Sequence, residues 1–388
     1  MEVVIASAVR TGNGRFGGKL KEATAVQTGA AAIKEAVART GIDGREVNEV
    51  IFGSGWQAGV GANPARLCTV ASGLPDTVPA FSVNIRCGSS LRAAIAGAQT
   101  ILAGDARIVV AGGTESTSNV PYALPDARWG HRMGDRTAVD LLQKDGFKCP
   151  LAGMLMGATA EILVEEYAIT RAEQDQFALE SHQKAVKALA EGRFVQEMTG
   201  VALKKGLFLE EEIPRADASL EALAKLAPVF KENGTVTAGN SCAMADAASA
   251  VVLMSREAAQ AAGIQPLAVI RGYSYVALDP KHMGLGPAKA IPAALQKAGL
   301  TLQDMDLIEV NEAFAAQVIA CERELKWDRA KLNVHGGAVA LGHPVAATGT
   351  KILATMLYAL QAYDKTLGIV SLCIGGGQGV AMVVERLS

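Results

Sequence analysis

The stretch Phe81-Ser82-Val83-Asn84-Ile85-Arg86-Cys87-Gly88-Ser89-Ser90-Leu91 runs from a predicted strand directly into a predicted helix. Residues 81–86 alternate apolar and polar side chains, which is typical of a short strand. Residues 91–102 are rich in Ala, Ile and Leu at helical spacing. The stretch therefore predicts a strand-to-helix turn, the junction from which layered α/β folds are built.

Cys87 lies at this turn and is a candidate nucleophile. The free N–H groups and the positive dipole end of the helix would favour its thiolate over its thiol. Ser89 and Ser90 are suitable caps for the same N–H groups. The alternative is that Cys87 is a small buried hydrophobic residue, as most single intracellular cysteines are.

Length and composition indicate a well-buried globular protein of two or three domain-sized units. The chain has 388 residues, of which 50% are hydrophobic and 20% charged, with a net charge of −2. Its interspersed charges give no sign of nucleic-acid binding or membrane binding. We recognise no signal peptide, membrane-spanning stretch or lipidation motif. The 6 cysteines include no C-x-x-C pair, so we expect a cytoplasmic protein with neither zinc nor a disulfide scaffold.

The same unit occurs twice along the chain. Residues 32–52 and 290–310 each read as an amphipathic helix, a glycine stop and a short buried strand, in near-identical register. Each half then repeats a turn, a helix and a strand that ends in glycines, with Cys87 at the first turn and His343 at the second. Two such halves facing one another would bring both turns toward a shared centre.

Residues 118–240 differ in character from both halves. They contain several prolines and one strong helix, predicted over 171–191, with Thr170 as its cap and Glu173 completing a capping box. We expect an inserted subdomain here. Insertions at strand ends commonly cover an active site or bind the remote part of a substrate.

Three more motifs join the turn at Cys87. They are Asn311-Glu312-Ala313-Phe314-Ala315, the glycine-rich turn 336–344 that delivers His343, and Cys373-Ile374-Gly375-Gly376-Gly377-Gln378-Gly379. Each has a structural alternative: Asn311 and Glu312 as helix caps, and His343 as a hydrogen-bonded turn residue. The glycine run lacks the strand-to-helix spacing of a dinucleotide or phosphate loop.

The joint order of these motifs, with the duplication, resembles the thiolase family over essentially the whole chain, and most closely its bacterial cytosolic acetyl-CoA acetyltransferases. Residues 4–11, 231–240 and 283–287 also carry the resemblance. It implies an α/β thiolase fold in which two duplicated α/β halves form a five-layered αβαβα core with an inserted loop subdomain. We expect the N-terminal half at 1–117 and 241–268, the inserted subdomain at 118–240 for CoA binding and oligomer contacts, and the C-terminal half at 269–388.

The resemblance also implies the reversible condensation of two acetyl-CoA into acetoacetyl-CoA and CoA. Cys87 would carry the acyl group as a thioester, and His343 would take and return its proton. Cys373 would remove a proton from the methyl group of the second acetyl-CoA. Negative charge would be stabilised by His343 with a water held by Asn311, and by the N–H groups of Cys87 and Gly375. CoA is then substrate and product, and no metal or other cofactor is expected.

Some residues depart from the family pattern. Ser90 and Ala346 replace usual glycines, which are mild changes. Cys242 stands where a serine commonly lies along the pantetheine arm of CoA, and it is a weaker hydrogen-bond donor. Leu155 stands where short-chain members commonly have histidine. These two predict altered CoA positioning, or an acyl pocket lined by Leu155, Met156, Met283 and Phe314. Arg215 matches a family arginine near the CoA adenine.

The resemblance implies a homo-oligomer, a tetramer or a dimer, and leaves the substrate range open. One alternative is a 3-ketoacyl-CoA thiolase of fatty-acid breakdown acting on longer chains. Another is a non-catalytic thiolase-like protein that binds acyl-CoA or lipid, against which the retention of Cys87, His343, Asn311 and Cys373 argues. A disulfide between Cys87 and Cys373 under oxidising conditions is a further hypothesis.

Overall fold

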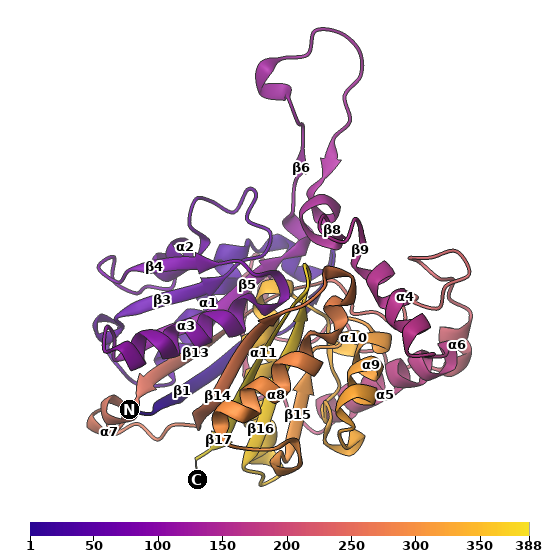
Figure 1. Cartoon of the computed structure of the whole chain (residues 1–388). Helices are drawn as coiled ribbons and strands as arrows, with labels where there is room; N and C mark the ends of the chain where they lie inside the picture. Colours follow the sequence, from indigo (N-terminus) through magenta and orange to yellow (C-terminus); the bar gives the residue numbers. More distant parts are fainter. Residues whose placement is uncertain (388) are drawn as a thin grey trace.

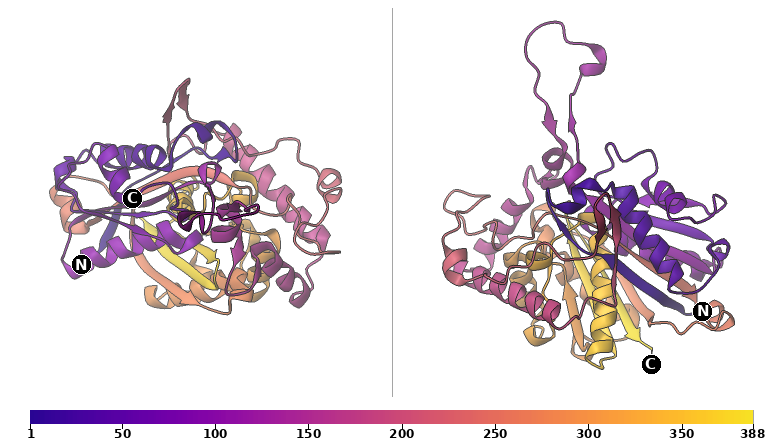
Figure 2. Two further views of the ribbon diagram at one scale, coloured as in Figure 1. Left: turned by 90° about the horizontal axis from the view of Figure 1, so that it is seen from above. Right: turned by 180° about the vertical axis from the view of Figure 1, so that it is seen from behind.

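The computed structural model describes residues 1–387, and its main feature is a mixed sheet of 11 strands with helices on both faces (Figure 1). Within the described part of the chain, no helix has the length and apolar character needed to cross a bilayer. The first strand, β1 (Val3–Thr11), begins and the last strand, β17 (Gln378–Arg386), ends away from the arm formed by strands β6 (Tyr122–Ala123) and β7 (Val139–Asp140) (Figures 1 and 2).

The sheet consists of two equivalent parts. In the N-terminal part the order is β4-β3-β5-β13-β1, and in the C-terminal part it is β15-β16-β17-β14. Pairs β3–β5 and β15–β16 are parallel, whereas β13–β5, β1–β13, β16–β17 and β14–β17 are antiparallel. The bounds are β1 (Val3–Thr11), β3 (Glu49–Gly53), β4 (Ala80–Val83), β5 (Ile108–Ser116), β13 (Ala245–Ser255), β14 (Ala268–Ala277), β15 (Leu307–Val310), β16 (Leu367–Ile374) and β17 (Gln378–Arg386).

The outer strands also correspond, because β3 pairs in parallel with β4 and Ile308 of β15 makes a parallel bridge with Leu332. Strands β1 and β14 pair antiparallel and join the two parts, with Val4 opposite Val269. The internal duplication predicted from the sequence is therefore present in the strand order and in the direction of each pair.

Five layers follow from how the helices cover the two parts. Helices α3 and α11 contact each other and lie between the two parts of the sheet, while α1 and α2 cover the outer face of the N-terminal part and α8 and α9 that of the C-terminal part. The bounds are α1 (Ala25–Ala38), α2 (Pro64–Ala71), α3 (Ser89–Ala103), α7 (Arg256–Ala261), α8 (Gly286–Ala298), α9 (Ala315–Leu325), α10 (Ala338–Leu341) and α11 (Thr348–Ala362). The predicted αβαβα core is confirmed.

Three clusters of apolar side chains fill the spaces between the layers. One buried cluster joins α3 and α11 to both parts of the sheet, with Ile95, Leu353, Val109 and Val370 among its members. A second lies under α1 and α2, and a third under α8 and α9. Because α3 and α11 are buried between the two parts of the sheet, close packing fixes the positions of their N-terminal turns.

The predicted strand at 81–86 is longer than the observed one. Strand β4 ends at Val83, where the Asn84 side chain accepts a hydrogen bond from the Arg86 N–H at 3.1 Å and donates to the Gly55 carbonyl at 3.1 Å. Arg86 itself has a left-handed backbone with φ of 59°. A local turn of this kind is incompatible with continued strand pairing, so Cys87 stands three residues beyond a bend.

The inserted segment between β5 and β13 has its own small elements. Its predicted long helix is observed as α5 (Arg171–Ala190), with the capping box between Thr170 and Glu173 as expected. The β6–β7 arm extends away from the body (Figure 1). The other elements are β8 (Lys148–Cys149), β9 (Met154–Leu155), α4 (Met156–Glu166), β10 (Met198–Thr199), β11 (Val201–Leu203), β12 (Gly206–Phe208) and α6 (Leu220–Ala224), while β2 (Gly14–Arg15) pairs with β13. The boundaries of the three predicted regions stay a prediction.

Candidate active site

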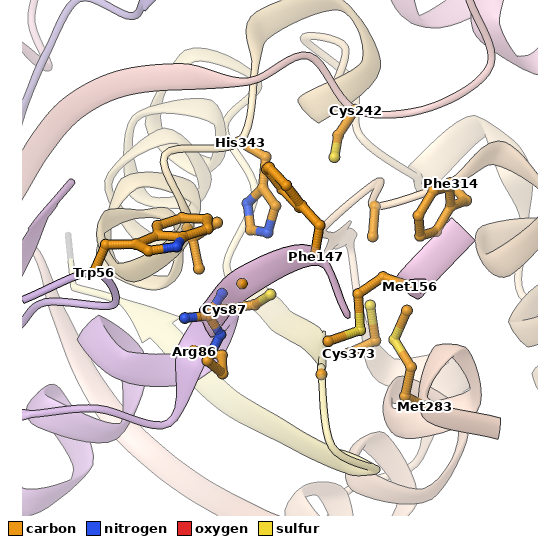
Figure 3. Close-up of a pocket in the computed structure, with 14 residues that line it drawn as sticks. Trp56, Arg86, Cys87, Phe147, Met156, Cys242, Met283, Phe314, His343 and Cys373 are labelled. Atoms are coloured by element: carbon orange, nitrogen blue, oxygen red, sulfur yellow. The ribbon is translucent and has the colours of Figure 1, made fainter. Parts of the chain in front are cut away.

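A cavity of about 70 Å³ lies where the turns of the two halves meet (Figure 3). Three sequence-predicted residues, Cys87, His343 and Cys373, share its wall although they come from three separate segments. Gly375, Met156, Met283, Phe314 and Cys242 line it as well. The other lining residues are Trp56, Arg86, Gly146, Phe147, Ala313 and Val345.

Cys87 lies in a short 3-10 turn, Arg86–Gly88, immediately before α3. Burial raises the pKa of its thiol, and the Arg86 charge together with the N–H groups of Gly375 and of Cys87 itself oppose that rise. The sequence had suggested a resting thiolate at this helix start. Because burial raises the pKa of the thiol, the helix start alone does not produce one. A thiol of this kind needs a base to take its proton.

The two serines after Cys87 have roles other than the expected caps. Helix α3 has no side-chain cap hydrogen bond. The Ser89 hydroxyl donates to the Arg86 carbonyl at 2.6 Å and accepts from the Ile85 N–H at 3.0 Å, which shapes the turn before the helix. The Ser90 hydroxyl accepts from the Thr350 N–H at 3.0 Å. Ser90 thus links the two central helices at the ends that face the cavity.

His343 is the candidate base. Its Nδ1 lies 2.7 Å from the Thr348 hydroxyl, which donates its single hydrogen to the Pro344 carbonyl at 3.0 Å. With the hydroxyl donating to Pro344, Nδ1 carries the ring hydrogen, and Nε2 is an acceptor without a partner among residues 1–387. Burial lowers the pKa of His343 to about 3, and the charges of Lys351 and Arg86 lower it further in the same direction. The ring is therefore neutral at physiological pH, with Nε2 as its acceptor atom.

Lys351 of α11 stabilises the turn that carries His343. The buried ammonium donates to the Gly342 carbonyl at 2.6 Å. Gly342 has φ of 85°, and a Cβ there would overlap Ile213 and Ala245, so the turn requires glycine. Burial lowers the pKa of Lys351 to about 8. The His343 N–H donates to the Ala243 carbonyl at 2.8 Å, which fixes the other side of the turn.

Cys373 is the penultimate residue of β16 and lies near Cys87 in the cavity (Figure 3). Burial raises the pKa of its thiol well above the ordinary value, and the neighbouring Cys87 raises it in the same direction. The turn that follows, through Gly376 and Gly377 with φ of 95° and 82°, brings the Gly375 N–H toward the Cys87 sulfur. Two thiols of raised pKa, an imidazole and a backbone donor therefore meet in one buried cavity.

Asn311 follows β15, and its N–H donates to the Ser371 carbonyl at 2.9 Å. Its side chain is 1% exposed, and neither amide atom has a partner within the described residues. A buried amide without protein partners suits an ordered water. Glu312 is instead fully engaged: it accepts from Ser181, Asn333 and the Val339 N–H, which ties the loop to the inserted segment.

The comparisons with known proteins agree with this arrangement. Residues 3–257 match the family described as "Thiolase, N-terminal domain", and residues 264–386 match "Thiolase, C-terminal domain". The chain belongs to the thiolase family.

Two curated relatives of this thiolase are named acetyl-CoA acetyltransferase. The protein of Escherichia coli (strain K12) is 50% identical over 390 residues, 99% of each chain. That of Chromobacterium violaceum is 47% identical over 391 residues, 100% of each chain. The crystal structure of the Bacillus anthracis acetyl-CoA acetyltransferase matches with a TM-score of 0.97 and 45% identity, covering 100% of this chain and 99% of that one.

Two residues that the sequence placed near substrate do not line the cavity of this thiolase. Leu155 ends β9 and is half-buried, one residue before Met156, which does line it. Arg215 is exposed, and its N–H donates to Nδ1 of the His182 ring at 3.2 Å. Their expected parts in acyl selection and adenine binding stay predictions. Cys242 is held beside the His343 turn, with its N–H donating to the Ala313 carbonyl at 3.0 Å.

Sequence reasoning missed four residues at or behind the thiolase cavity. Trp56, Arg86 and Phe147 line it. Glu115 lies behind the wall and accepts from the N–H groups of Gly55, Trp56 and Ala346 at 2.9–3.1 Å, so one carboxylate holds turns from both halves. Burial raises the pKa of Glu115 to about 7. Only Arg86 had a signal in the sequence, its place directly before the candidate nucleophile.

Proposed function

We propose that this thiolase is an acetyl-CoA C-acetyltransferase that condenses two acetyl-CoA into acetoacetyl-CoA and CoA, and catalyses the reverse cleavage. The observation that carries the proposal is the convergence of Cys87, His343 and Cys373 on one apolar cavity. Relatives that are 47–50% identical over nearly their whole length and carry the name acetyl-CoA acetyltransferase support it.

In the first half-reaction Cys87 is the nucleophile. Nε2 of His343 takes the thiol proton as the sulfur attacks the thioester carbonyl, and it then gives a proton to the leaving CoA sulfur. The bare Nε2 implied by the Thr348 contact supports this assignment. A CoA thioester is exchanged for an enzyme thioester, so the step changes little in bond energy.

In the second half-reaction the Cys373 thiol gives its proton to Nε2 of His343, which is free once CoA has left, and the resulting thiolate removes a proton from the methyl carbon of a second acetyl-CoA. The carbanion attacks the acyl group on Cys87, and His343 returns its proton to the departing Cys87 sulfur. In the cleavage direction Cys373 returns that proton. Charge on one thioester oxygen is stabilised by the N–H groups of Cys87 and Gly375. The other oxygen is bound by His343 and by a water on Asn311, whose unpaired buried amide supports this role.

Substrate contacts are assigned to the rest of the cavity. Met156, Met283 and Phe314 bound the acyl group, and Cys242 lies along the pantetheine arm. Leu155 acts from behind Met156, and Arg215 binds near the adenine. The substrates and products are acetyl-CoA, acetoacetyl-CoA and CoA, with no further cofactor and no metal.

The assembly and its location are part of the proposal. We infer a homo-oligomer, a tetramer or a dimer, with contacts from the inserted segment. The β6–β7 arm supports this, since Trp129 and Met133 within it are 86% and 91% exposed. We infer a cytoplasmic enzyme that takes part in fatty acid metabolism.

A second candidate function is the thiolysis of longer 3-ketoacyl-CoA. The "Probable acetyl-CoA acyltransferase" of Staphylococcus epidermidis, 44% identical over 389 residues, favours keeping it open. A non-catalytic acyl-CoA or lipid binder is the candidate of another class. It would need neither a base nor two thiols, so the presence of His343, Cys87 and Cys373 in one cavity argues against it.

The deciding experiment is CoA-dependent cleavage of acetoacetyl-CoA by wild type, Cys87→Ser and Cys149→Ser. Cys149 is a matched control because it is buried outside the cavity and its sulfur accepts from the Ala152 N–H at 3.4 Å, a bond that serine keeps. We expect cleavage by wild type and Cys149→Ser and none by Cys87→Ser. Absence of cleavage by folded wild type, with activity on longer 3-ketoacyl-CoA, would favour the second candidate.

A further inference from the structure

Arg86 places a guanidinium in the wall of the cavity next to the nucleophile (Figure 3). Apart from Arg86, the Cys242 thiol and the reacting groups Cys87, His343 and Cys373, the lining is apolar or backbone. The Trp56 and Phe147 rings line the cavity as well. Arg86 keeps a left-handed backbone with φ of 59°, a conformation that costs an ordinary residue about 1 kcal/mol or more. A cation in this position, beside the reacting groups, is suited to bind an anionic part of the substrate.

The contacts of the Arg86 guanidinium leave most of its donors free. Its plane lies over the Trp56 ring at 4.5 Å, and Nη1 donates to the Gly55 carbonyl at 3.3 Å. Within residues 1–387 it makes no ion pair, whereas the buried Arg10 pairs with both Glu197 and Glu211. The ring fixes the orientation of the guanidinium, and its remaining N–H groups stay available to an anion.

Glu115 does not neutralise Arg86 by contact. Its oxygens are occupied by the N–H groups of Gly55, Trp56 and Ala346. It is fully buried, and burial raises its pKa to about 7, so part of this carboxyl is protonated near neutral pH. The cavity side of Arg86 therefore keeps a positive field.

The anion that fits is part of the acyl group. The phosphates of CoA are separated from its sulfur by the whole pantetheine arm, so with the sulfur at Cys87 they cannot reach a guanidinium one residue away. We propose that Arg86 binds a carboxylate at the far end of a short acyl chain, so that this site accepts 3-oxoacyl-CoA thioesters of dicarboxylic acids. The inference rests on the proposed thiolase activity and extends its substrate class.

The reaction on such a substrate balances like the one already described. His343 takes the Cys87 proton as the sulfur adds to the C3 carbonyl, the C2–C3 bond breaks, and the electron pair on C2 takes the proton of Cys373 to give acetyl-CoA. The proton held by His343 then passes to the Cys373 sulfur. The acyl chain with its carboxylate stays on Cys87. The sulfur of free CoA then attacks that thioester, its proton passing through His343, and releases the dicarboxylic acid as a CoA monothioester.

The test compares two six-carbon substrates that differ only in the terminal group: 3-oxohexanoyl-CoA and 3-oxohexanedioyl-CoA. Wild type should cleave the carboxylate-ended substrate with a kcat/KM at least about tenfold higher, as expected for hydrogen bonds to a charged group. Arg86→Met should lose about 10- to 100-fold more on 3-oxohexanedioyl-CoA than on 3-oxohexanoyl-CoA. Arg86→Lys should restore part of the difference, since it returns the charge without the planar fork.

Arg92→Met is the matched control, because Arg92 also stacks on an aromatic ring, that of Tyr275 at 4.4 Å, but lies outside the cavity. It should leave the preference unchanged. Equal losses on both substrates in Arg86→Met, or no preference in wild type, would overturn the proposal while acetoacetyl-CoA cleavage still upholds the thiolase activity. Failure of all three substrates, acetoacetyl-CoA included, would remove the proposed function and this inference together.

Discussion

Replacing Thr348 by valine tests how the structure sets the base. Thr348 is 0% exposed, and its hydroxyl is the partner of His343 Nδ1, at 2.7 Å. Valine matches threonine in shape but offers no acceptor. In Thr348→Val the Nδ1–H is buried without a partner, and the ring gains by moving the hydrogen to Nε2, the atom that must accept the Cys87 proton.

The size of the effect follows from the burial of the ring. An unpaired buried donor costs about 1–3 kcal/mol. If this free energy shifts the balance between the two tautomers, the form with a bare Nε2 falls by about 5- to 150-fold at 25 °C. We expect kcat/KM for acetoacetyl-CoA cleavage to fall by the same factor, with a smaller change in KM.

Two assays separate this cause from a general loss of structure. Alkylation of Cys87 by iodoacetamide needs the base but no CoA site, and its rate should fall with kcat/KM. Thr348→Ser keeps the hydroxyl and should stay within a few-fold of wild type. Wild-type alkylation and turnover in Thr348→Val would refute the tautomer assignment, and equal losses in serine and valine variants would assign the effect to packing.

Two further predictions concern the same cavity. In Cys373→Ala, Cys87 should still become acetylated by acetyl-CoA, but no acetoacetyl-CoA should form, because no group accepts the methyl proton. Intact-mass measurement checks the acetylation, and the condensation assay checks the second step. Condensation at the wild-type rate would assign the methyl proton to another group. The pKa of His343 falls from 6.5 unfolded to about 3 folded, so the unfolded chain binds the proton more tightly and stability is lost as the pH falls below 6.5. Compared with His343→Gln, wild type should lose about 2–3 kcal/mol of unfolding free energy between about pH 7 and about pH 4.5 in guanidinium unfolding, and parallel pH profiles would contradict the neutral buried ring.

The duplicated fold could be predicted because the local sequence pattern of each repeat indicates its helix and its strand. Residues 32–52 and 290–310 carry a helix period, a glycine stop and a buried strand, and local patterns of this kind survive in the structure. The antiparallel pairing of β1 with β14 could not be predicted, since it joins strands far apart in the sequence through backbone atoms. The end of β4 was also missed, because Asn84 and Arg86 form a turn that alternation does not encode.

The reacting residues could be predicted and their surroundings could not. Cys87, His343 and Cys373 each stand in a short motif, and the order of the motifs pointed to one site. Trp56 and Phe147 carry no such motif, since their place in the wall depends on how distant loops pack. The prediction of a Cys87 thiolate from the helix dipole was wrong for a related reason. Burial raises the pKa of Cys87, and the local sequence does not reveal burial.

The matching strand orders of the two halves have a consequence for the chemistry. Cys87 and His343 stand at corresponding turns, each just before a central helix, α3 in one half and α11 in the other. A pair of identical chains assembled in this way would present the same side chain from both turns, two thiols or two imidazoles. Because both halves belong to one polypeptide, the two turns can carry different residues, a proton donor in one and a proton acceptor in the other. The asymmetry that proton transfer demands is thus supplied by covalent linkage of two units that are otherwise alike.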